Sequence, residues 1–339
     1  MNKEILCSVS TRGRYDTTLP MTLMSIVTQT RKPDKLMLFD DNEKPRDLRE
    51  NQHYLYIFQI LDELGINWEV VFAEKKGQHY NHHKANNMGY KWVWRLDDDT
   101  VADANVLETL YSHTQKTNPT TYEREADDTI GAVGGAILTP PVLRNIVATG
   151  KIENIDHESN IQWDYIKAVK EVDHLHCSFL YRAGVAEYCL ELSRVAHREE
   201  TLFTYALKKK GYKNLVVPNA VTWHLKNKDG GIRDGDAALF AADENIFRNH
   251  LSLADSTIVV LNCGMGDHIV FNHVLPKIKN PVIFTCYPEI VPGRSIAEAE
   301  TMFGNIDRYN VYQRMDEWNW KGSLEEGFIK MYVRDNERN

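Results

Sequence analysis

Short apolar runs alternate with segments of helical periodicity over the first hundred residues. Apolar, β-branched runs predict strands over residues 4–11, 35–41, 66–74 and 92–99. Apolar residues three and four positions apart, with breaks at turn residues, predict helices over residues 18–30, 52–65 and 82–91. Strands that alternate with helices in this way indicate a parallel or mostly parallel sheet covered on both faces.

The pattern is looser after residue 100. Helices are predicted over residues 103–115, 199–211 and 237–251. Strands are predicted over residues 129–138, 174–182 and 214–225, the last with a bend at Pro218. Residues 226–236 are rich in Gly and Asp and predict a loop. A new α/β pattern starts at Ser256 and continues through residues 281–287, 295–303 (helix-like) and 309–313, so we place a domain boundary near residues 251–256.

Composition and charge narrow the class of protein. At 339 residues the chain can form one large domain or two ordinary ones, and 42% hydrophobic with 26% charged residues predicts a packed soluble protein. The net charge of −8 argues against a broad basic face for nucleic acid or anionic lipid, although residues 207–213 form a local basic stripe. No run approaches 18 consecutive apolar residues, so we expect no integral membrane segment.

The cysteines and histidines do not predict a zinc site. The chain has 5 cysteines, an odd number, without CxxC or zinc-type spacing. With an N-terminus that runs directly into a strand pattern, they predict reduced thiols and a cytoplasmic location. Adjacent histidines on a helix point in different directions, so His79, His82 and His83 favour surface or nucleotide-bordering roles.

Acidic residues follow two of the predicted strands. Asp40 and Asp41 end one of them, and Asp97, Asp98 and Asp99 end another. Ligands of open α/β sheets bind beyond the carboxyl ends of the strands. Carboxylates gathered there favour Mg²⁺ or Mn²⁺ bridging a diphosphate. The alternative is an acidic strand–loop junction that caps the next helix, and the three aspartates alone do not decide between the two.

Three blocks of sequence carry a family resemblance. Residues 5–41 combine a strand, a short polar loop, a helix with SIVTQT and a strand that ends in Asp-Asp. Residues 86–100 combine an Asn-x-Gly helix with a strand that ends in DDD, and residues 198–224 combine an acidic pair, an amphipathic helix, Gly-Tyr, a strand with Pro and a His. In this order the blocks resemble the family 2 glycosyltransferases, which have the GT-A fold, invert the anomeric centre and carry a DXD motif.

The resemblance implies a fold class and a domain organisation. We expect an α/β protein of GT-A type, a Rossmann-like mixed sheet flanked by helices, with a small C-terminal α/β domain. Residues 1–250 would be the glycosyltransferase domain, with a nucleotide-binding half at 1–100 and an acceptor-side half at 101–250. Residues 256–339 would be an accessory domain. Its NCGMGDHI segment (262–269) faintly resembles the first nucleotide-binding turn of GT-B enzymes such as heptosyltransferases, but too little chain follows for a full Rossmann domain. We therefore expect it to serve acceptor binding or assembly.

The resemblance also implies residues that bind the nucleotide sugar. The first loop would border the nucleotide through Ser10, Thr11, Arg12 and Arg14. Asp40 would accept a hydrogen bond from a uracil-type base, and Asp41 or Asn42 would approach the ribose. Further donor-side residues would be Lys84, Asn87, Asp97 and Asp98. Of the three consecutive aspartates, Asp98 is the one expected to tolerate change.

Metal binding and catalysis are implied at four positions. Asp99 would be the direct ligand of Mn²⁺ or Mg²⁺, Asp97 would hold the ribose or a metal-bound water, and His224 would complete the metal sphere. Glu200 would be the catalytic base. The sequence departs from the family in having Glu rather than Asp at the base, Asn86 rather than Arg before the second-block Asn, and Ala206 rather than Arg on the acceptor helix.

The implied reaction is inverting transfer of a hexosyl or pentosyl group from a nucleotide-diphosphate sugar, most simply a UDP-sugar, to an acceptor hydroxyl. The acceptor could be a glycan or a lipid-linked glycan, and the acidic balance makes a modified DNA base a less favoured choice. A sugar-nucleotide nucleotidyltransferase would need a Gly-rich basic N-terminal signature that STRGRYD does not match. A non-catalytic nucleotide-sugar-binding protein would not need both Asp99 and Glu200.

Among the aromatic residues, Trp92 and Trp94 alternate and predict core positions, whereas Trp223 suits sugar stacking and core packing equally.

Overall fold

The computed structural model describes residues 3–139, 168–225, 230–231, 237–250, 257–261, 277, 281–285 and 310–313. The chain divides into two compact units, Met1–Ile246 and Phe247–Asn339. Of the expected features, the helix at 295–303 and the NCGMGDHI turn lie outside the described residues, as do two of the five cysteines, Cys263 and Cys286. No helix in the described part of the chain is long and apolar enough to cross a membrane.

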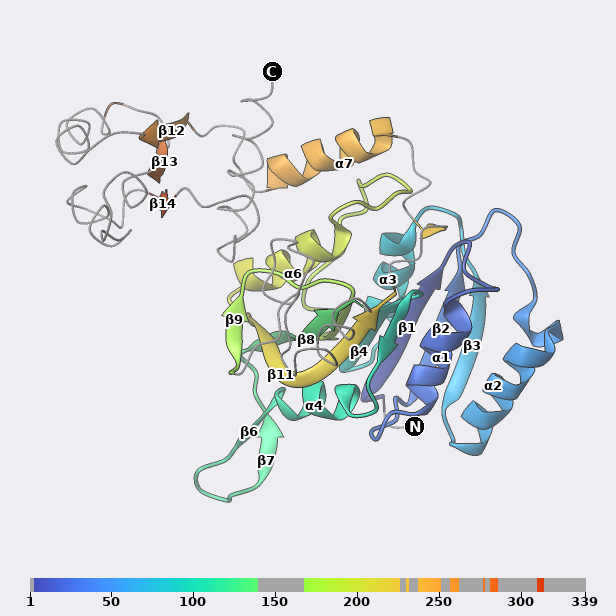
Figure 1. Ribbon diagram of the computed structural model, residues 1–339. Coiled ribbons are helices and arrows are strands. Elements are labelled where there is room, and N and C mark those ends of the chain that lie inside the picture. Colours follow the sequence, from blue (N-terminus) through green and yellow to red (C-terminus); the bar gives the residue numbers. More distant parts are fainter. Residues whose placement is uncertain are drawn as a thin grey trace, which may run out of the picture. The chain divides into compact units, whose positions relative to one another are not determined.

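The first unit is built on a nine-stranded mixed sheet (Figure 1). Its parallel half has the order β3-β2-β1-β4, formed by β1 (Ile5–Thr11), β2 (Lys35–Asp40), β3 (Asn67–Phe72) and β4 (Trp92–Asp97). β10 (Ser178–Arg182) runs antiparallel to β4 and to β8 (Ile130–Leu138), and β11 (Lys213–His224) runs parallel to β8. β5 (Thr100–Ala102) and β9 (Lys170–Val172) pair antiparallel with β11, and β6 (Gln115–Thr117) and β7 (Arg124–Ala126) form a separate hairpin. The mixed α/β architecture is therefore confirmed, and the parallel arrangement holds for the first four strands.

Helices cover both faces of this sheet. α1 (Leu19–Val27), α2 (Gln52–Glu63) and α4 (Val106–Ser112) pack on one face, and α3 (Gln78–Asn86) and α6 (Glu199–Lys209) pack on the other. The first unit also contains the 3-10 turn η1 (Leu48–Glu50) and the part of α7 (Ala237–His250) up to residue 246. The Asn51 side chain accepts a hydrogen bond from His53 N at the start of α2, and Gly65, with φ of 70°, follows its end. The glycine relieves the steric cost of that left-handed turn.

The helix α3 begins at Gln78, four residues before the expected start at His82. The buried face of α3 is polar, since it carries His79, Asn81, His82 and Asn86. A search for apolar residues at helical spacing does not detect such a face. Two of these polar side chains have partners in the sheet, since His82 Nδ1 lies 2.9 Å from Ser8 Oγ and Asn81 Nδ2 donates to Ser10 Oγ at 2.9 Å.

The two faces of β4 bury different kinds of side chain. Trp92 and Trp94 are fully buried in the core that also contains residues of α1, α2 and α4, which confirms their predicted core role. Val93 packs on the opposite face, in the core that contains residues of α3 and α6. Because side chains alternate along a strand, Arg95 and Asp97 point to that second face.

The strand β11 is bent beside β8, as the sequence predicts at Pro218. The register between the two strands shifts between Val216 and Val221, and Asn219 has φ of 65°. The bend brings Ala220 so close that a Cβ placed on Gly135 would lie 1.8 Å from the Ala220 carbonyl oxygen. A glycine at position 135 is therefore required for the closest approach of β8 and β11.

The helix α7 holds the loop that precedes α6. The carboxylate of Asp243 accepts hydrogen bonds from Ser193 N (2.6 Å), Ser193 Oγ (3.0 Å) and His197 N (2.9 Å). Glu244 contacts Arg198 Nε at 3.2 Å and His197 Nε2 at 3.3 Å. This loop leads directly into Glu199 and Glu200, so α7 helps to position the start of α6.

The second unit contains a small parallel sheet. β12 (Thr257–Leu261), β13 (Pro281–Thr285) and β14 (Asn310–Gln313) form it in the order β12-β13-β14, as the apolar runs predict.

We expect Gly135→Ala to destabilise the first unit by about 3 kcal/mol, because the added methyl group forces β8 and β11 apart. Urea unfolding followed by tryptophan fluorescence measures this. Gly184→Ala is the control, since Gly184 has φ of 72° but no atom within 4 Å of the added Cβ, and should cost about 1 kcal/mol. Equal effects of the two substitutions would contradict the packing argument.

We expect the contribution of Glu244 to stability to disappear in acid. Burial opposes the charge of Glu244, but its contacts with His197 and Arg198 outweigh burial and lower its pKa to about 2. The folded state therefore favours the carboxylate, and the contribution is complete above about pH 4.5 and lost as the pH falls towards 2. Glu244→Gln should lower the melting temperature at pH 7, and the difference from the unmodified chain should vanish near pH 2. A difference independent of pH would contradict the assignment.

Candidate active site at the carboxyl edge of the sheet

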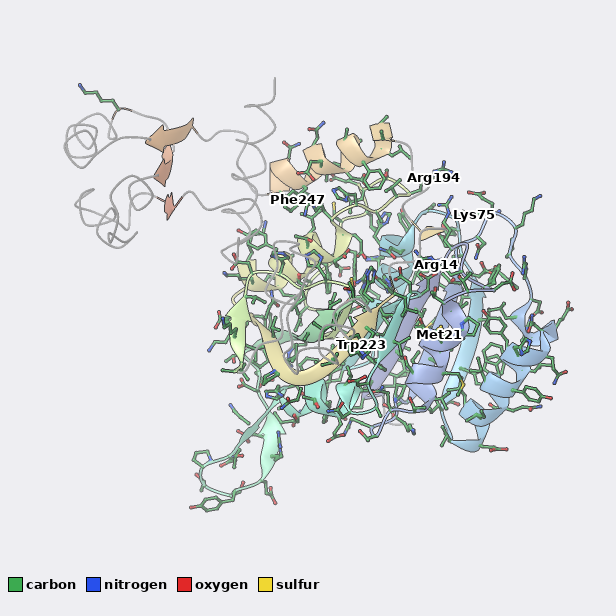
Figure 2. The ribbon with its side chains drawn as sticks, viewed as in Figure 1. Arg14, Met21, Lys75, Arg194, Trp223 and Phe247 are labelled. Carbon is green, nitrogen blue, oxygen red and sulfur yellow. The ribbon has the colours of Figure 1, made fainter. Side chains whose placement is uncertain are left out.

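The parallel strands bring residues from three separate segments to one edge. In the register of the sheet, Thr11 lies opposite Asp40 across β1 and β2, and Ser10 lies opposite Asp97 across β1 and β4. The first loop, the β2 carboxyl end and the three aspartates are therefore neighbours. Arg14 lies beyond the end of β1 at this edge (Figure 2).

Asp98 ties the first loop to the end of β4. Its Oδ2 accepts hydrogen bonds from Thr11 Oγ1 (2.8 Å) and Arg12 N (3.1 Å), and its Oδ1 lies 3.8 Å from Arg14 Nη1. Burial and the neighbouring Asp99 raise its pKa above the ordinary value for an aspartate. The expectation that Asp98 tolerates change is therefore corrected, because a replacement would leave several buried donors without an acceptor.

Asp99 faces a guanidinium and an imidazole. Its Oδ2 lies 2.5 Å from Arg14 Nη1, and its Oδ1 lies 3.4 Å from His224 Nε2. The antiparallel pairing of β5 with β11 creates the second contact, since His224 is in register with Thr100 and Leu225 N donates to the Asp99 carbonyl (2.8 Å). Burial raises the pKa of Asp99, but His224 and Arg14 outweigh it, and the pKa lies well below its usual range.

Arg95 is a buried cation that the sequence reasoning missed. Its side chain is fully buried, and Nη2 forms ion pairs with Asp97 (3.0 Å), with Glu199 and, at 3.8 Å, with Glu200. It therefore connects the end of β4 to the start of α6. Its position two residues before Asp97, on the same face of β4, was the available signal, because a charged residue inside an apolar run needs a partner.

The acidic pair at the start of α6 has two different environments. Glu199 is completely buried beside Arg95 and accepts a hydrogen bond from Gln78 Nε2 at 3.1 Å. Burial raises the pKa of Glu199 well above its ordinary value, and Arg95 does not offset this. Burial also acts on Glu200, but there Arg95 and His176, whose Nδ1 is 3.4 Å away, outweigh it and lower the pKa. Glu200 is thus the ionised member of the pair.

The two buried arginines at this edge supply fewer positive charges than there are carboxyl groups around them. Two buried guanidinium groups, Arg14 and Arg95, face a larger set of carboxyl groups, namely Asp97, Asp98, Asp99, Glu199 and Glu200. Burying unpaired carboxylates is costly, so the surplus favours protonation or a further cation.

Asp99 and His224 have the chemistry of ligands for Mg²⁺ or Mn²⁺, a hard oxygen donor and an imidazole nitrogen that already approach each other. Among the described residues, no third Asp, Glu, His or Cys forms a tight group with them. That ligand count suits an ion completed by water and phosphate oxygens. Arg14 competes for the same aspartate.

The second aspartate cluster is engaged within the protein. Asp40 is buried and accepts hydrogen bonds from the Tyr15 hydroxyl, Asn42 Nδ2 (2.7 Å) and Asn42 N (3.1 Å). Gly13 N donates to Asn42 Oδ1 at 2.6 Å, and Gly77 N donates to Asp41 at 3.1 Å. These contacts shape the first loop, and they occupy the Asp40 oxygens that the resemblance assigns to a nucleobase.

The other residues predicted to bind the nucleotide sugar lie in different environments. Ser10 Oγ accepts a hydrogen bond from Asn81 Nδ2 (2.9 Å) beneath the edge, and the partly exposed Arg12 side chain pairs with Glu43 at 3.5 Å. Lys84 pairs with Glu74 at 2.7 Å on the surface, and this contact does not support its expected role in binding the nucleotide sugar.

Asn87 is a clear correction. It is exposed at the far end of α3, where its Nδ2 donates to His83 O at 3.0 Å. The chain there approaches the start of β1, since Lys91 N donates to Lys3 O at 2.9 Å. Asn87 is therefore near the opposite edge of the sheet from the aspartates, because α3 runs back from one edge to the other.

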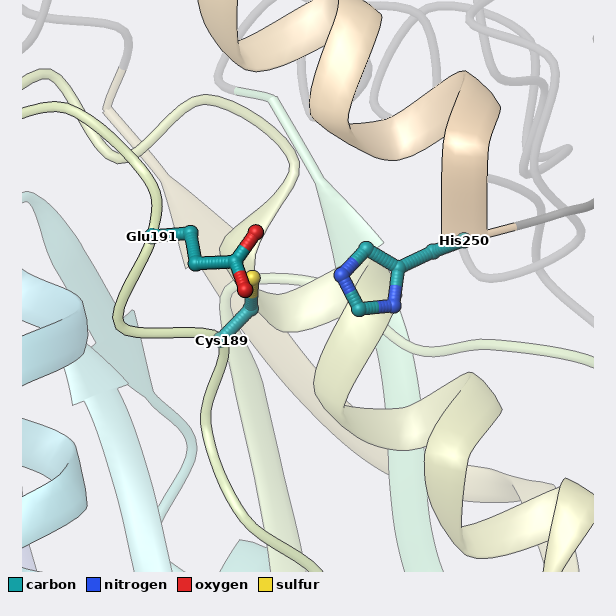
Figure 3. A group of neighbouring side chains, drawn as sticks. All are labelled: Cys189, Glu191 and His250. Atoms are coloured by element: carbon teal, nitrogen blue, oxygen red, sulfur yellow. The ribbon is translucent and has the colours of Figure 1, made fainter.

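Other candidate groups do not join the site. Trp223 is partly buried on the face of β11 opposite His224, and its Nε1 donates to Asp103 at 3.0 Å, which favours packing over sugar stacking (Figure 2). Figure 3 draws Cys189, Glu191 and His250, a possible metal-ligand trio. The first two belong to the first unit and His250 to the second, so neither unit contains the trio and we assign no metal to it.

Fold and site together define a mixed α/β protein with a carboxylate-rich site at the carboxyl edge of its sheet. No family model matches the chain, and no curated protein matches it. It is similar to a solved structure, mannosyltransferase PcManGT from Pyrobaculum calidifontis in complex with GDP-Man and Mn²⁺, with a TM-score of 0.45 and 13% sequence identity. The match covers 75% of this chain and 64% of that chain, less than two thirds of its length. A likeness this distant does not assign an activity.

We expect Arg95→Met to destabilise the protein by about 4 kcal/mol, because it leaves buried carboxylates unpaired. Urea unfolding measures the loss. Glu199→Gln should have a small effect by itself, because Arg95 still pairs with Asp97, and it should recover part of the stability when combined with Arg95→Met.

Arg49→Met is the matched control for Arg95→Met. Arg49 pairs with Asp47 on the surface, with more than half of its side chain exposed, 54%, and its loss should cost about 0.5 kcal/mol or less. A similar effect at positions 49 and 95 would contradict a buried role for Arg95.

Proposed function

We propose that this protein is a metal-dependent, inverting glycosyltransferase of GT-A type that transfers a sugar from a nucleotide-diphosphate sugar to an acceptor hydroxyl. The supporting observation is the convergence of residues from three distant blocks. Asp99 lies beside His224, and Asp97 is joined to Glu200 through Arg95. A structural acidic junction would not require Glu200 and His224 at the same place.

The proposed chemistry assigns one task to each group. Glu200, ionised and held by Arg95 and His176, takes the proton of the acceptor hydroxyl as that oxygen attacks the anomeric carbon. Asp97 would hold the ribose or a water on the divalent ion. Asp99 and His224 would hold a divalent ion, which supplies Lewis-acid stabilisation of the leaving diphosphate. Attack from the side opposite the leaving group inverts the anomeric centre, and no covalent intermediate is needed.

For the donor and the acceptor we propose only the chemical class of each molecule. A UDP-sugar is the proposed donor, on the family resemblance alone, because the Asp40 oxygens have partners within the protein. The acceptor carries a hydroxyl group and would be a glycan or lipid-linked glycan, since the acidic balance of the chain disfavours a modified DNA base. The division into a nucleotide-binding and an acceptor-side half, an accessory role for the C-terminal unit and a cytoplasmic location also stay predictions.

Release of UDP from a panel of UDP-sugars with Mn²⁺ tests this function. We expect Asp99→Asn and Glu200→Gln each to lower kcat by on the order of 100-fold or more, through loss of ion binding and of the base respectively. GDP-sugars added to the same panel test which nucleobase the donor site prefers.

The matched controls are the exposed residues Asp128 and Glu63, changed to Asn and Gln. Both should retain full turnover. Unchanged turnover in Asp99→Asn and Glu200→Gln, or no turnover with any nucleotide sugar, would overturn the proposal.

A further inference from the structure

We infer that Arg14 is a built-in counter-cation of the aspartate cluster, which competes with the divalent ion for Asp99 and weakens ion binding in the absence of nucleotide. The inference rests on the proposed function only in taking Asp99 and His224 as the ion ligands. It concerns how this chain controls access to those ligands.

The first observation is the position of the guanidinium. Arg14 Nη1 lies 2.5 Å from Asp99 Oδ2 and 3.8 Å from Asp98 Oδ1, and the residue is 3% exposed. A cation thus already contacts the aspartate to which the ion is assigned. Asp99 can give its full charge to a metal only if this contact loosens.

The second observation is the enclosure of Arg14. Its Nη2 donates to Gly230 O at 3.4 Å, and Gly231 N donates to Arg12 O at 2.9 Å, so a short glycine segment covers the loop. A Cβ on Gly231 would lie 2.8 Å from Arg14 Nη2, and one on Gly230 would lie 2.9 Å from Gly13 O. The glycines allow the backbone to approach the guanidinium closely.

The third observation is an unsatisfied donor. Arg14 Nε is buried and has no hydrogen-bond acceptor among the described residues. A buried N–H without an acceptor is costly and marks a group that is poised for another partner. A guanidinium pairs strongly with phosphate oxygens, so an incoming diphosphate is the chemistry that would draw Arg14 away from Asp99.

These observations lead to an order of events. Without nucleotide, Arg14 neutralises Asp99 and the divalent ion binds weakly. When a diphosphate arrives, Arg14 exchanges a carboxylate for a phosphate partner, and Asp99 becomes available to the ion. Ion and nucleotide should therefore bind with strong mutual dependence.

The test measures MnCl₂ binding without nucleotide, by calorimetry and by the electron paramagnetic resonance signal of free Mn²⁺. We expect Arg14→Gln to bind Mn²⁺ at least tenfold more tightly than the unmodified protein, and Arg14→Lys to fall between them. Arg49→Gln is the control and should leave Mn²⁺ affinity unchanged, since Arg49 pairs with Asp47 on the surface instead. Adding Asp99→Asn to Arg14→Gln should remove the gain.

Thermal unfolding provides a second readout. In EDTA, Arg14→Gln should melt below the unmodified protein, and Mn²⁺ should restore its stability more than NaCl of equal ionic strength. If Arg14→Gln does not fold in EDTA, folding on addition of Mn²⁺ is the expected result. Failure of Mn²⁺ to fold it, or equal Mn²⁺ affinity in Arg14→Gln, Arg14→Lys and the unmodified protein, would overturn the inference.

The experiments can contradict the proposed enzyme function and the proposed role of Arg14 independently of each other. Mn²⁺ affinity that does not depend on Arg14 would contradict the counter-cation role while turnover still depended on Asp99 and Glu200. Absence of turnover with every nucleotide sugar would contradict the enzyme function while leaving the effect of Arg14 on Mn²⁺ binding intact.

Discussion

The neutralisation of buried carboxylates is the constraint on which the carboxyl edge of this sheet depends. Strand β4 leaves the apolar core at the first of three consecutive aspartates, and α6 begins with two glutamates directed at the same place. Such groups cannot be buried as isolated charges. Each therefore has a cation, a backbone donor or a raised pKa to compensate it.

The compensation determines how the segments of the first unit meet. Arg95 joins the end of β4 to the start of α6, and Arg14 joins the loop after β1 to Asp98 and Asp99. The pairing of β5 with β11 places His224 opposite Asp99, and α7 fixes the loop ahead of α6 through Asp243. The electrostatic contacts thus hold together elements that are far apart along the chain, and the same contacts arrange the groups from which a transfer site can be built.

Residues of equal chemical type have unequal roles at this edge. Glu199 and Glu200 are adjacent, yet burial raises the pKa of the first well above its ordinary value, while Arg95 and His176 lower the pKa of the second. Asp98 is a structural acceptor for the first loop, whereas Asp99 presents one oxygen to an arginine and one to a histidine. These differences come from exposure and neighbours, so a motif identifies the set of residues without assigning the task of each member.

The sequence by itself determined the alternation of strands and helices, the core positions of Trp92 and Trp94, the bend at Pro218 and the gathering of Asp40 and Asp97 at one edge, because hydrophobic periodicity and turn chemistry are local. Only the tertiary structure decided that Arg95 lies between Asp97 and Glu199, that Asp98 anchors a loop and that Asn87 faces the opposite edge. Those outcomes depend on strand order, on the direction of α3 and on which charges are buried together. They are relations between distant segments, and no local pattern of residues records them.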